Sequence, residues 1–114
     1  MDRHLKAHLF DIGTAIDEVY SFFEQVPKRF DEYQNNLMLR RAIERNIGII
    51  GEAMNKLLKE NPNVAISYAK AIIATRNRVI HDYAAVTDDV MWKIVINDLP
   101  KLKEEVASLL AEDA

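Results

Sequence analysis

Cysteine is absent from the 114-residue chain, and glycine and proline occur only three times each. Without cysteine the chain has no disulfides, no thiolate ligands for a metal and no cysteine nucleophile. The few glycines and prolines, together with 49% hydrophobic residues, argue against a disordered or low-complexity chain. The length suits one compact domain, so we expect a single domain over residues 1–114.

Long hydrophobic runs are also absent. No stretch approaches the roughly 18 uncharged apolar residues of a membrane span, and Asp2, Arg3, His4 and Lys6 interrupt the apolar segment that a signal peptide needs. Together with the lack of cysteine, this predicts a soluble cytoplasmic protein with no membrane partner. An excess of positive charge is missing too, because 15 basic against 18 acidic residues give a net charge of −3. That total argues against a protein that coats nucleic acid through charge alone.

Hydrophobic side chains recur at the spacing of an α-helix along most of the chain. The first stripe alternates steps of four and three residues and consists of Leu5, Leu9, Ile12, Ile16, Val19 and Phe23. It predicts a helix that ends near Glu24, before Pro27. A second stripe predicts a helix from about Glu32 to Glu60, which the turn residues Asn61-Pro62-Asn63 end.

Two further helices complete the predicted fold. The third spans about Val64 to Ile80, with Pro62 near its start. The fourth begins after Thr87, a predicted N-cap that two aspartates follow, and Pro100 kinks or splits it. Four long helices joined by short loops predict an all-α fold, an antiparallel up-and-down bundle.

The third predicted helix carries an arginine where a hydrophobic residue is expected. At about 100° per residue, its hydrophobic side chains fall within an arc from roughly −120° to +20° around Ile73, and Arg76 falls near the middle of that arc. A guanidinium cannot lose its charge, so an unpaired one on the core face is costly. Either Arg76 pairs with a buried carboxylate, with Glu44 and Glu52 as candidates, or this face opens onto a cleft that binds an anion.

A histidine follows five residues later, but on a regular helix it does not share a face with the arginine. The angle between Arg76 and His81 is about 140°. The two side chains can still converge if the helix ends near Ile80 and turns the histidine back. They can also converge if two copies of the segment face each other across a two-fold axis.

The local charge is compatible with an anion site. Residues 64–81 carry Lys70, Arg76 and Arg78 and no acidic side chain, so their charge is +3. The acidic excess lies at the two ends of the chain. The alternative is a plain helix end, where the helix dipole favours cations and no function is needed.

The run Arg76-Asn77-Arg78-Val79-Ile80-His81-Asp82-Tyr83 resembles a signature of known proteins. Its pattern, R-x4-H-x-Y, is similar to that of HepT-like proteins, which are the HEPN-fold toxins of HEPN–MNT toxin–antitoxin pairs. Residues 41–45 and 49–53 resemble the second helix of this family, and residues 90–95 and 98–102 resemble its last helix. The likeness covers the chain from about residue 5 to residue 110.

The resemblance implies a HEPN-like helical bundle that forms a homodimer. It also implies a metal-independent endoribonuclease, without a cofactor, whose two motifs line one cleft. The expected partner is a small MNT-family nucleotidyltransferase antitoxin, as in a type VII-like toxin–antitoxin pair. In such pairs the antitoxin can transfer AMP from ATP to the motif tyrosine, which corresponds to Tyr83 here.

The chemistry of RNA cleavage assigns roles to the motif residues. The 2′-hydroxyl of the substrate can serve as nucleophile, and His81 suits the proton transfer because the ordinary pKa of histidine is about 6.5. Arg76 suits bidentate contact with phosphate oxygens. Asn77 and Asp82 are expected to support these two residues. The remaining cations of the stretch, Arg78 and Lys70, are expected to bind the RNA backbone.

Two other interpretations stay open. The chain can be a non-catalytic helical module that docks with a nucleotidyltransferase and helps to bind its nucleotide or substrate. It can also be a bundle whose arginine and histidine are incidental. RNA turnover distinguishes the first of these from the enzyme, and loss of function on mutating Arg76 or His81 excludes the second.

Three features outside the motif have simpler expected roles. His4 and His8 have a spacing that can hold a metal, but without an obvious third ligand they are expected on a solvated surface. Gly48 and Gly51 allow close backbone approach, either inside the bundle or at a dimer seam. The aromatic side chains are expected to form core or dimer contacts rather than base-stacking platforms, and they include Phe22, Phe23, Phe30 and Trp92.

Overall fold

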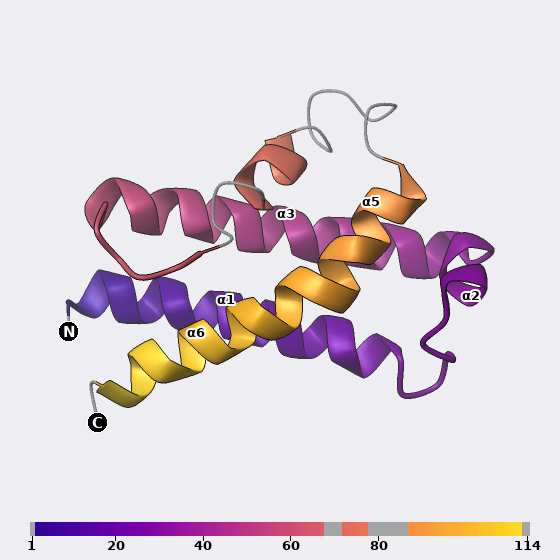
Figure 1. Ribbon diagram of the computed structural model, residues 1–114, viewed down its shortest axis with the longest axis horizontal. Coiled ribbons are helices and arrows are strands. Elements are labelled where there is room, and N and C mark those ends of the chain that lie inside the picture. Colours follow the sequence, from indigo (N-terminus) through magenta and orange to yellow (C-terminus); the bar gives the residue numbers. More distant parts are fainter. Residues whose placement is uncertain (1, 68–71, 78–86, 113–114) are drawn as a thin grey trace.

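The computed structural model describes residues 2–67, 72–77 and 87–112 of the chain. Within these ranges every regular element is helical, which confirms the predicted all-α class. Figure 1 shows two long helices, α1 and α3, that run antiparallel, and a third long helical span, from α5 to α6, that crosses them. The two ends of the described chain lie on the same side of the molecule (Figure 1).

Helix α1 spans Arg3–Phe22 and ends two residues before the predicted Glu24. Its N-cap is Asp2, whose side chain accepts a hydrogen bond from the backbone N–H of His4. The predicted stripe is its buried face, which consists of Leu9, Ile12, Ala15, Ile16 and Val19. Periodicity was therefore sufficient to locate this helix.

The second predicted helix is two helices in the structure, which corrects the predicted start at Glu32. The short helix α2 spans Phe30–Gln34, and the long helix α3 spans Leu37–Glu60. Asn36 separates them as the N-cap of α3, because its side chain accepts a hydrogen bond from the N–H of Leu39 at 3.0 Å. Helix α3 ends at Glu60, as predicted.

The third predicted helix does not begin at Val64. Residues 64–66 are not helical, and the N–H groups of Val64 and Ile66 donate to Asn61 and Val64 in tight turns. The N–H of Ser67 donates to the carboxylate of Glu105 on α6. These local and distant acceptors replace the helical ones at residues 64–67. Among the described residues of the predicted third helix, only 72–77 are helical.

The last helical span is continuous but changes its winding. Helix α5 spans Asp88–Lys93, the π-helical turn η2 spans Ile94–Asp98, and α6 spans Leu99–Glu112. Thr87 is the N-cap, as predicted, although its side chain makes no capping hydrogen bond. Pro100 has no N–H to donate, and the wider turn just before it is how the helix accommodates that loss. The predicted kink is thus a π-helical turn.

The hydrophobic core lies between α1, α3 and the α5–α6 span. Its buried side chains come from all of these elements and include Ile16, Ile47, Met54 and Leu102. Burial of each such side chain contributes roughly 1.5–3 kcal/mol. One buried polar residue, Asn46, ties α3 to α1 by donating from Nδ2 to the carbonyl of Ala15 at 3.0 Å.

An aromatic cluster closes the end of the bundle near α2. The ring of Trp92 lies 5.4 Å from Tyr33, 5.8 Å from Phe23 and 6.2 Å from Phe30, measured between ring centroids. Tyr33 is fully buried among these rings. The cluster agrees with the prediction that these aromatic residues are core contacts. Among the described helices, none has the length and hydrophobicity that a membrane crossing requires.

Candidate functional site

The helical segment of residues 72–77 carries Arg76 and lies against α3 (Figure 1). Ile72 is fully buried and Thr75 is buried, whereas Ile73 and Arg76 are partly buried and Asn77 is exposed. The buried face therefore centres on Ile72 and Thr75. The predicted position of Arg76 in the middle of the core face is wrong, because the segment is rotated so that Arg76 lies at the edge of the buried face.

The stem of Arg76 rests directly on the backbone of α3 at Gly51. A Cβ atom at position 51 would lie 2.5 Å from the Cβ of Arg76 and 2.9 Å from its Cγ. Real carbon atoms do not approach this closely without repulsion. Of the two predicted roles for Gly51, the described residues support close approach inside the bundle.

The guanidinium of Arg76 has one hydrogen-bond partner among the described residues. Its Nη1 donates to the side-chain oxygen of Asn77 at 2.9 Å. Its Nε is buried and has no partner in this part of the chain. A buried donor without an acceptor is costly, and an anion that reached this nitrogen would remove that cost.

The two carboxylates that the sequence offered as partners of Arg76 pair elsewhere. Glu44 accepts from Nη1 of Arg41 at 3.0 Å, and Glu52 lies 3.6 Å from Nζ of Lys56. Arg76 is instead held by Asn77, which the sequence had assigned a supporting role. Among the described residues, no carboxylate pairs with the guanidinium of Arg76.

The other five predicted site residues all lie outside the described residues. These are Lys70, Arg78, His81, Asp82 and Tyr83. The structure therefore places Arg76 and Asn77 side by side, and the remaining site assignments stay predictions.

A contact that the sequence did not suggest joins Ser67, the last described residue before the 72–77 segment, to α6. The carboxylate of Glu105 accepts from the N–H of Ser67 at 2.9 and 3.2 Å and from its hydroxyl at 3.0 Å. Ser67 stands five residues before the 72–77 segment. No local pattern signals this pairing, because the two residues are 38 positions apart.

The arginines of residues 28–45 are largely engaged with acidic side chains. Arg29 pairs with Asp31, with Nη2 at 2.9 Å from the carboxylate, and this bond holds the pKa of Asp31 below its ordinary value. Arg40 lies 4.0 Å from Asp88, and its Nη1 donates to the carbonyl of Gln34. Arg29, Arg40 and Arg41 therefore each have a carboxylate within 4.0 Å.

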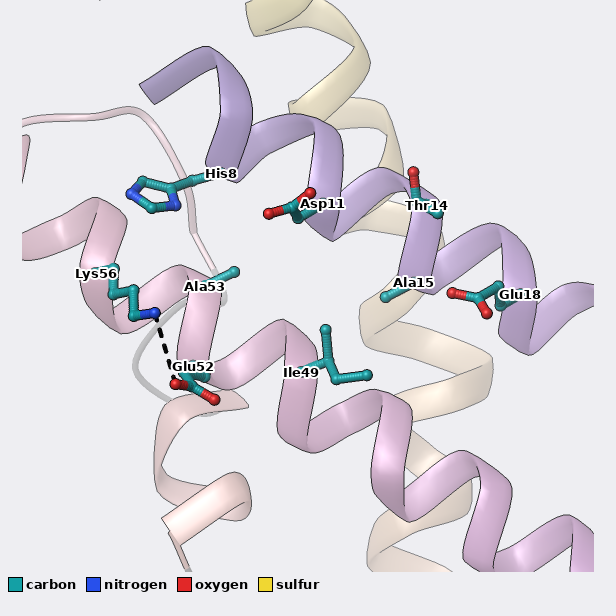
Figure 2. A pocket seen from close by; sticks show the side chains of 9 residues that line it. All are labelled: His8, Asp11, Thr14, Ala15, Glu18, Ile49, Glu52, Ala53 and Lys56. Atoms are coloured by element: carbon teal, nitrogen blue, oxygen red, sulfur yellow. Dashed lines mark ion pairs between the residues drawn. The ribbon is translucent and has the colours of Figure 1, made fainter. Parts of the chain in front are cut away.

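A groove of about 400 Å³ lies between α1 and α3 (Figure 2). Acidic, basic and small side chains line it, and the labelled residues are His8, Asp11, Thr14, Ala15, Glu18, Ile49, Glu52, Ala53 and Lys56. The prediction that His8 lies on a solvated surface is wrong. Its side chain is only 17% exposed, and its Nε2 lies 3.2 Å from the carboxylate of Glu60. Among the described residues no three His, Asp or Glu side chains gather in the way that metal ligands do.

The chain is similar over most of its length to known proteins. Residues 12–109 match the model of the family described as Ribonuclease HepT-like. A protein of Methanocaldococcus jannaschii named "Putative RNase" is 37% identical over 108 residues, which cover 91% of this chain and 94% of that protein. A protein of Thermococcus cleftensis named "Probable ribonuclease HepT" is 29% identical over 113 residues, with coverages of 96% and 98%. No solved structure matches the chain.

The fold and these similarities define the class of this protein: it is a small all-helical protein whose relatives are named as ribonucleases. Within that class, the chain belongs to the Ribonuclease HepT-like family. The family match confirms the resemblance that the sequence motif indicated.

Proposed function

We propose that this protein is a metal-independent endoribonuclease and the toxin of a type VII-like HEPN–MNT toxin–antitoxin pair. The observation that carries the proposal is the family match over residues 12–109, which includes the whole run from Arg76 to Tyr83. The names of the relatives point to RNA as the substrate. The catalytic residues in this proposal are Arg76 and His81.

The proposed reaction uses the 2′-hydroxyl of the RNA as nucleophile. Its oxygen forms a bond to the adjacent phosphorus, and the bond from phosphorus to the 5′-oxygen of the next nucleotide breaks. The products are a 2′,3′-cyclic phosphate and a free 5′-hydroxyl. One His81 imidazole accepts the proton of the 2′-hydroxyl, and a second His81, protonated, gives a proton to the leaving oxygen.

Arg76 stabilises the negative charge that develops on the phosphorane. A guanidinium whose stem is packed and whose Nη1 is already held by Asn77 needs little reorganisation to bind phosphate oxygens. In this proposal Asn77 and Asp82 support the two catalytic residues, and Arg78 and Lys70 hold the RNA backbone.

A homodimer supplies both histidines. Two copies related by a two-fold axis bring two Arg76 and two His81 side chains into one cleft. Refolding wild-type protein together with a large excess of inactive His81→Ala protein tests this arrangement. The activity per wild-type chain should fall sharply, because nearly every wild-type chain then lies in a mixed dimer that holds one His81 instead of two. Activity that stays proportional to the amount of wild-type protein, despite the formation of mixed dimers, contradicts a shared site.

The proposed partner is an MNT-family nucleotidyltransferase antitoxin that silences the toxin by modifying Tyr83. The phenolic oxygen of Tyr83 forms a bond to the α-phosphorus of ATP, and the bond from that phosphorus to the oxygen bridging the α- and β-phosphates breaks. Pyrophosphate leaves, and the phenol proton passes to a base or to solvent. The product is a tyrosine that carries AMP two residues from His81. The added anion would compete with RNA for Arg76 and obstruct the cleft.

The nuclease activity is tested with purified protein and RNA, with and without EDTA. We expect cleavage that survives EDTA, yields 2′,3′-cyclic phosphate ends, and is lost in Arg76→Ala and His81→Ala. Arg76→Lys keeps the charge but not the fork geometry, so it should retain only part of the activity. Arg3→Ala is the matched control, because it removes one positive charge from an exposed position on α1.

The outcomes of this test separate the interpretations. If folded wild-type protein does not cleave RNA but binds its nucleotidyltransferase, the non-catalytic module described above replaces the enzyme. If Arg76→Ala and His81→Ala cleave like the wild type, the two residues are not catalytic.

Modification is tested by intact mass after incubation of the protein with antitoxin and ATP. The wild type should gain the mass of one adenylate, and Tyr83→Phe should gain none. An equal gain in both proteins would exclude Tyr83 as the sole acceptor.

A further inference from the structure

Gly51 differs from the other two glycines of the chain in what surrounds it. All three are in helices without a positive φ, so none is needed for an unusual backbone conformation. A Cβ at Gly48 would meet no described atom within 4 Å, and one at Gly13 would meet only Val106 at an ordinary 3.8 Å. A Cβ at Gly51 would meet Arg76 at 2.5 Å. Space, not backbone conformation, is what glycine provides at position 51.

The atom that occupies this space cannot move aside by itself. It is the Cβ of Arg76, which is attached to the backbone and does not move when the side chain changes rotamer. The same segment is anchored one turn earlier by Ile72, which is fully buried and whose carbonyl oxygen would lie 3.4 Å from the added atom. To relieve a contact of 2.5 Å, the whole 72–77 segment would have to shift by about 1 Å.

We propose that Gly51 is a positioning residue for Arg76, and that the bare backbone of α3 at this point sets where the guanidinium lies in the catalytic cleft. The inference rests on the proposed role of Arg76. The guanidinium is the far end of a stem that begins at the contact with Gly51, so a shift of the stem is passed on to the phosphate-binding group. A displacement of about 1 Å of a group that acts on the transition state can lower the rate by about 100-fold.

The hydrogen bonds of Arg76 make it sensitive to this displacement. Nη1 bonds to Asn77, on the same segment, and Nε is buried in the described part of the chain. When the segment moves, Arg76 and Asn77 move together relative to α3. Among the described residues, no carboxylate on another element pairs with the guanidinium and holds it in its former place. Gly51 therefore fixes the distance between the guanidinium and groups on other elements.

The first test compares Gly51→Ala with two matched controls, Gly48→Ala and Gly13→Ala. All three substitutions add one methyl group to a helix interior, where alanine is favoured over glycine. We expect Gly51→Ala to lower kcat for RNA cleavage by about 10- to 100-fold while the folded fraction by circular dichroism stays that of the wild type. The two controls should keep the wild-type kcat.

The second test reads the position of the guanidinium directly. The Nε–H signal of Arg76 in a ¹⁵N–¹H NMR spectrum is identified by its loss in Arg76→Lys. It should shift in Gly51→Ala and stay in place in Gly48→Ala. A substitution that only weakened the fold would leave this signal unchanged in the folded protein.

The third test uses thermal stability and needs no activity. Gly51→Ala should lower Tm in the wild-type background, where it meets the Cβ and Cγ of Arg76. In an Arg76→Gly background both atoms are gone, so the same substitution should raise Tm by about 3–6 °C through the helix preference for alanine. A change in sign between the two backgrounds assigns the effect to this one contact.

The outcomes are decisive in each case. Wild-type kcat and an unshifted Arg76 signal in Gly51→Ala would overturn the inference. A fall in Tm of equal size in both backgrounds would also overturn it, because the contact would then not involve Arg76. If the wild type does not cleave RNA at all, the proposed function fails, whereas the NMR and Tm comparisons still decide whether Gly51 positions Arg76.

Discussion

Replacing Glu105 by alanine removes the acceptor that ties the segment after α3 to α6. The carboxylate accepts from the N–H of Ser67 at 2.9 and 3.2 Å and from its hydroxyl at 3.0 Å. Ser67 is the last described residue before the 72–77 segment that carries Arg76, and this contact joins it to α6. Its loss should lower the stability of the fold.

The size of the stability effect follows from the kind of bond and its exposure. Hydrogen bonds to a charged group contribute about 1.5–3 kcal/mol each, but Glu105 is only partly buried and its charge is screened by water. We expect the free energy of unfolding to fall by about 1–2 kcal/mol in Glu105→Ala. For a domain of this size, that corresponds to a decrease in Tm of about 4–10 °C. Ser67→Ala removes only the hydroxyl contact, so its effect should be about half as large or less.

Glu104→Ala is the control for the Glu105 experiment. Glu104 precedes Glu105 on α6, carries the same charge and is exposed. Both substitutions therefore change the net charge and the helix propensity of α6 in the same way. Thermal and urea unfolding should show a loss for Glu105→Ala and a change within about 0.5 kcal/mol for Glu104→Ala.

Amide hydrogen exchange locates the effect. The N–H of Ser67 should exchange about 10-fold faster in Glu105→Ala, since 1.4 kcal/mol corresponds to a factor of ten. If the two glutamate variants have the same Tm and the same exchange rate at Ser67, the contact contributes nothing and the reasoning is refuted.

Two further predictions concern buried polar groups. The hydroxyl of Tyr33 is buried and has no hydrogen-bond partner among the described residues, so Tyr33→Phe should raise the free energy of unfolding by about 1 kcal/mol in a urea titration. Burial also raises the pKa of Tyr33, so the folded state keeps the proton that the unfolded chain releases above about pH 10, and the wild type should lose stability there while Tyr33→Phe loses less. Identical alkaline transitions in the two proteins would contradict this. Asn46→Ala removes the bond from Nδ2 to the carbonyl of Ala15 and leaves a small cavity between α1 and α3, so it should lower the free energy of unfolding by about 1–3 kcal/mol; a change below about 0.5 kcal/mol would show that the bond is not needed.

Hydrophobic periodicity located the long helices well because each has one side against the core. Helix α1 ends within two residues of its prediction, and α3 ends at Glu60 as predicted. The break at Asn36 was missed because no glycine or proline between residues 30 and 40 marks it, and only the capping bond from the N–H of Leu39 to Asn36 shows where α3 begins. Pro100 was correctly taken as a disturbance, but its form, a π-helical turn from Ile94 to Asp98, depends on how the span packs on the core.

The chemistry proposed for the candidate site comes from the sequence, and the structure describes the placement of two of its residues, Arg76 and Asn77. The sequence contained the charged and titratable groups that RNA cleavage requires, and it placed Asn77 beside Arg76. It put Arg76 in the middle of the buried face, whereas the segment is rotated toward Ile72 and Thr75. A helical wheel states the angles between side chains, but the direction of the core is set by the neighbouring helix.

The sequence by itself determined the all-helical class, the membership in the Ribonuclease HepT-like family and the motif from Arg76 to Tyr83. These follow from local patterns, because helix formation and motif chemistry depend on residues a few positions apart. Only the tertiary structure decided that Arg76 rests on Gly51 and that Ser67 is held by Glu105. Such contacts join residues far apart in the chain, and they depend on the angle and register at which the helices meet, which local periodicity does not contain.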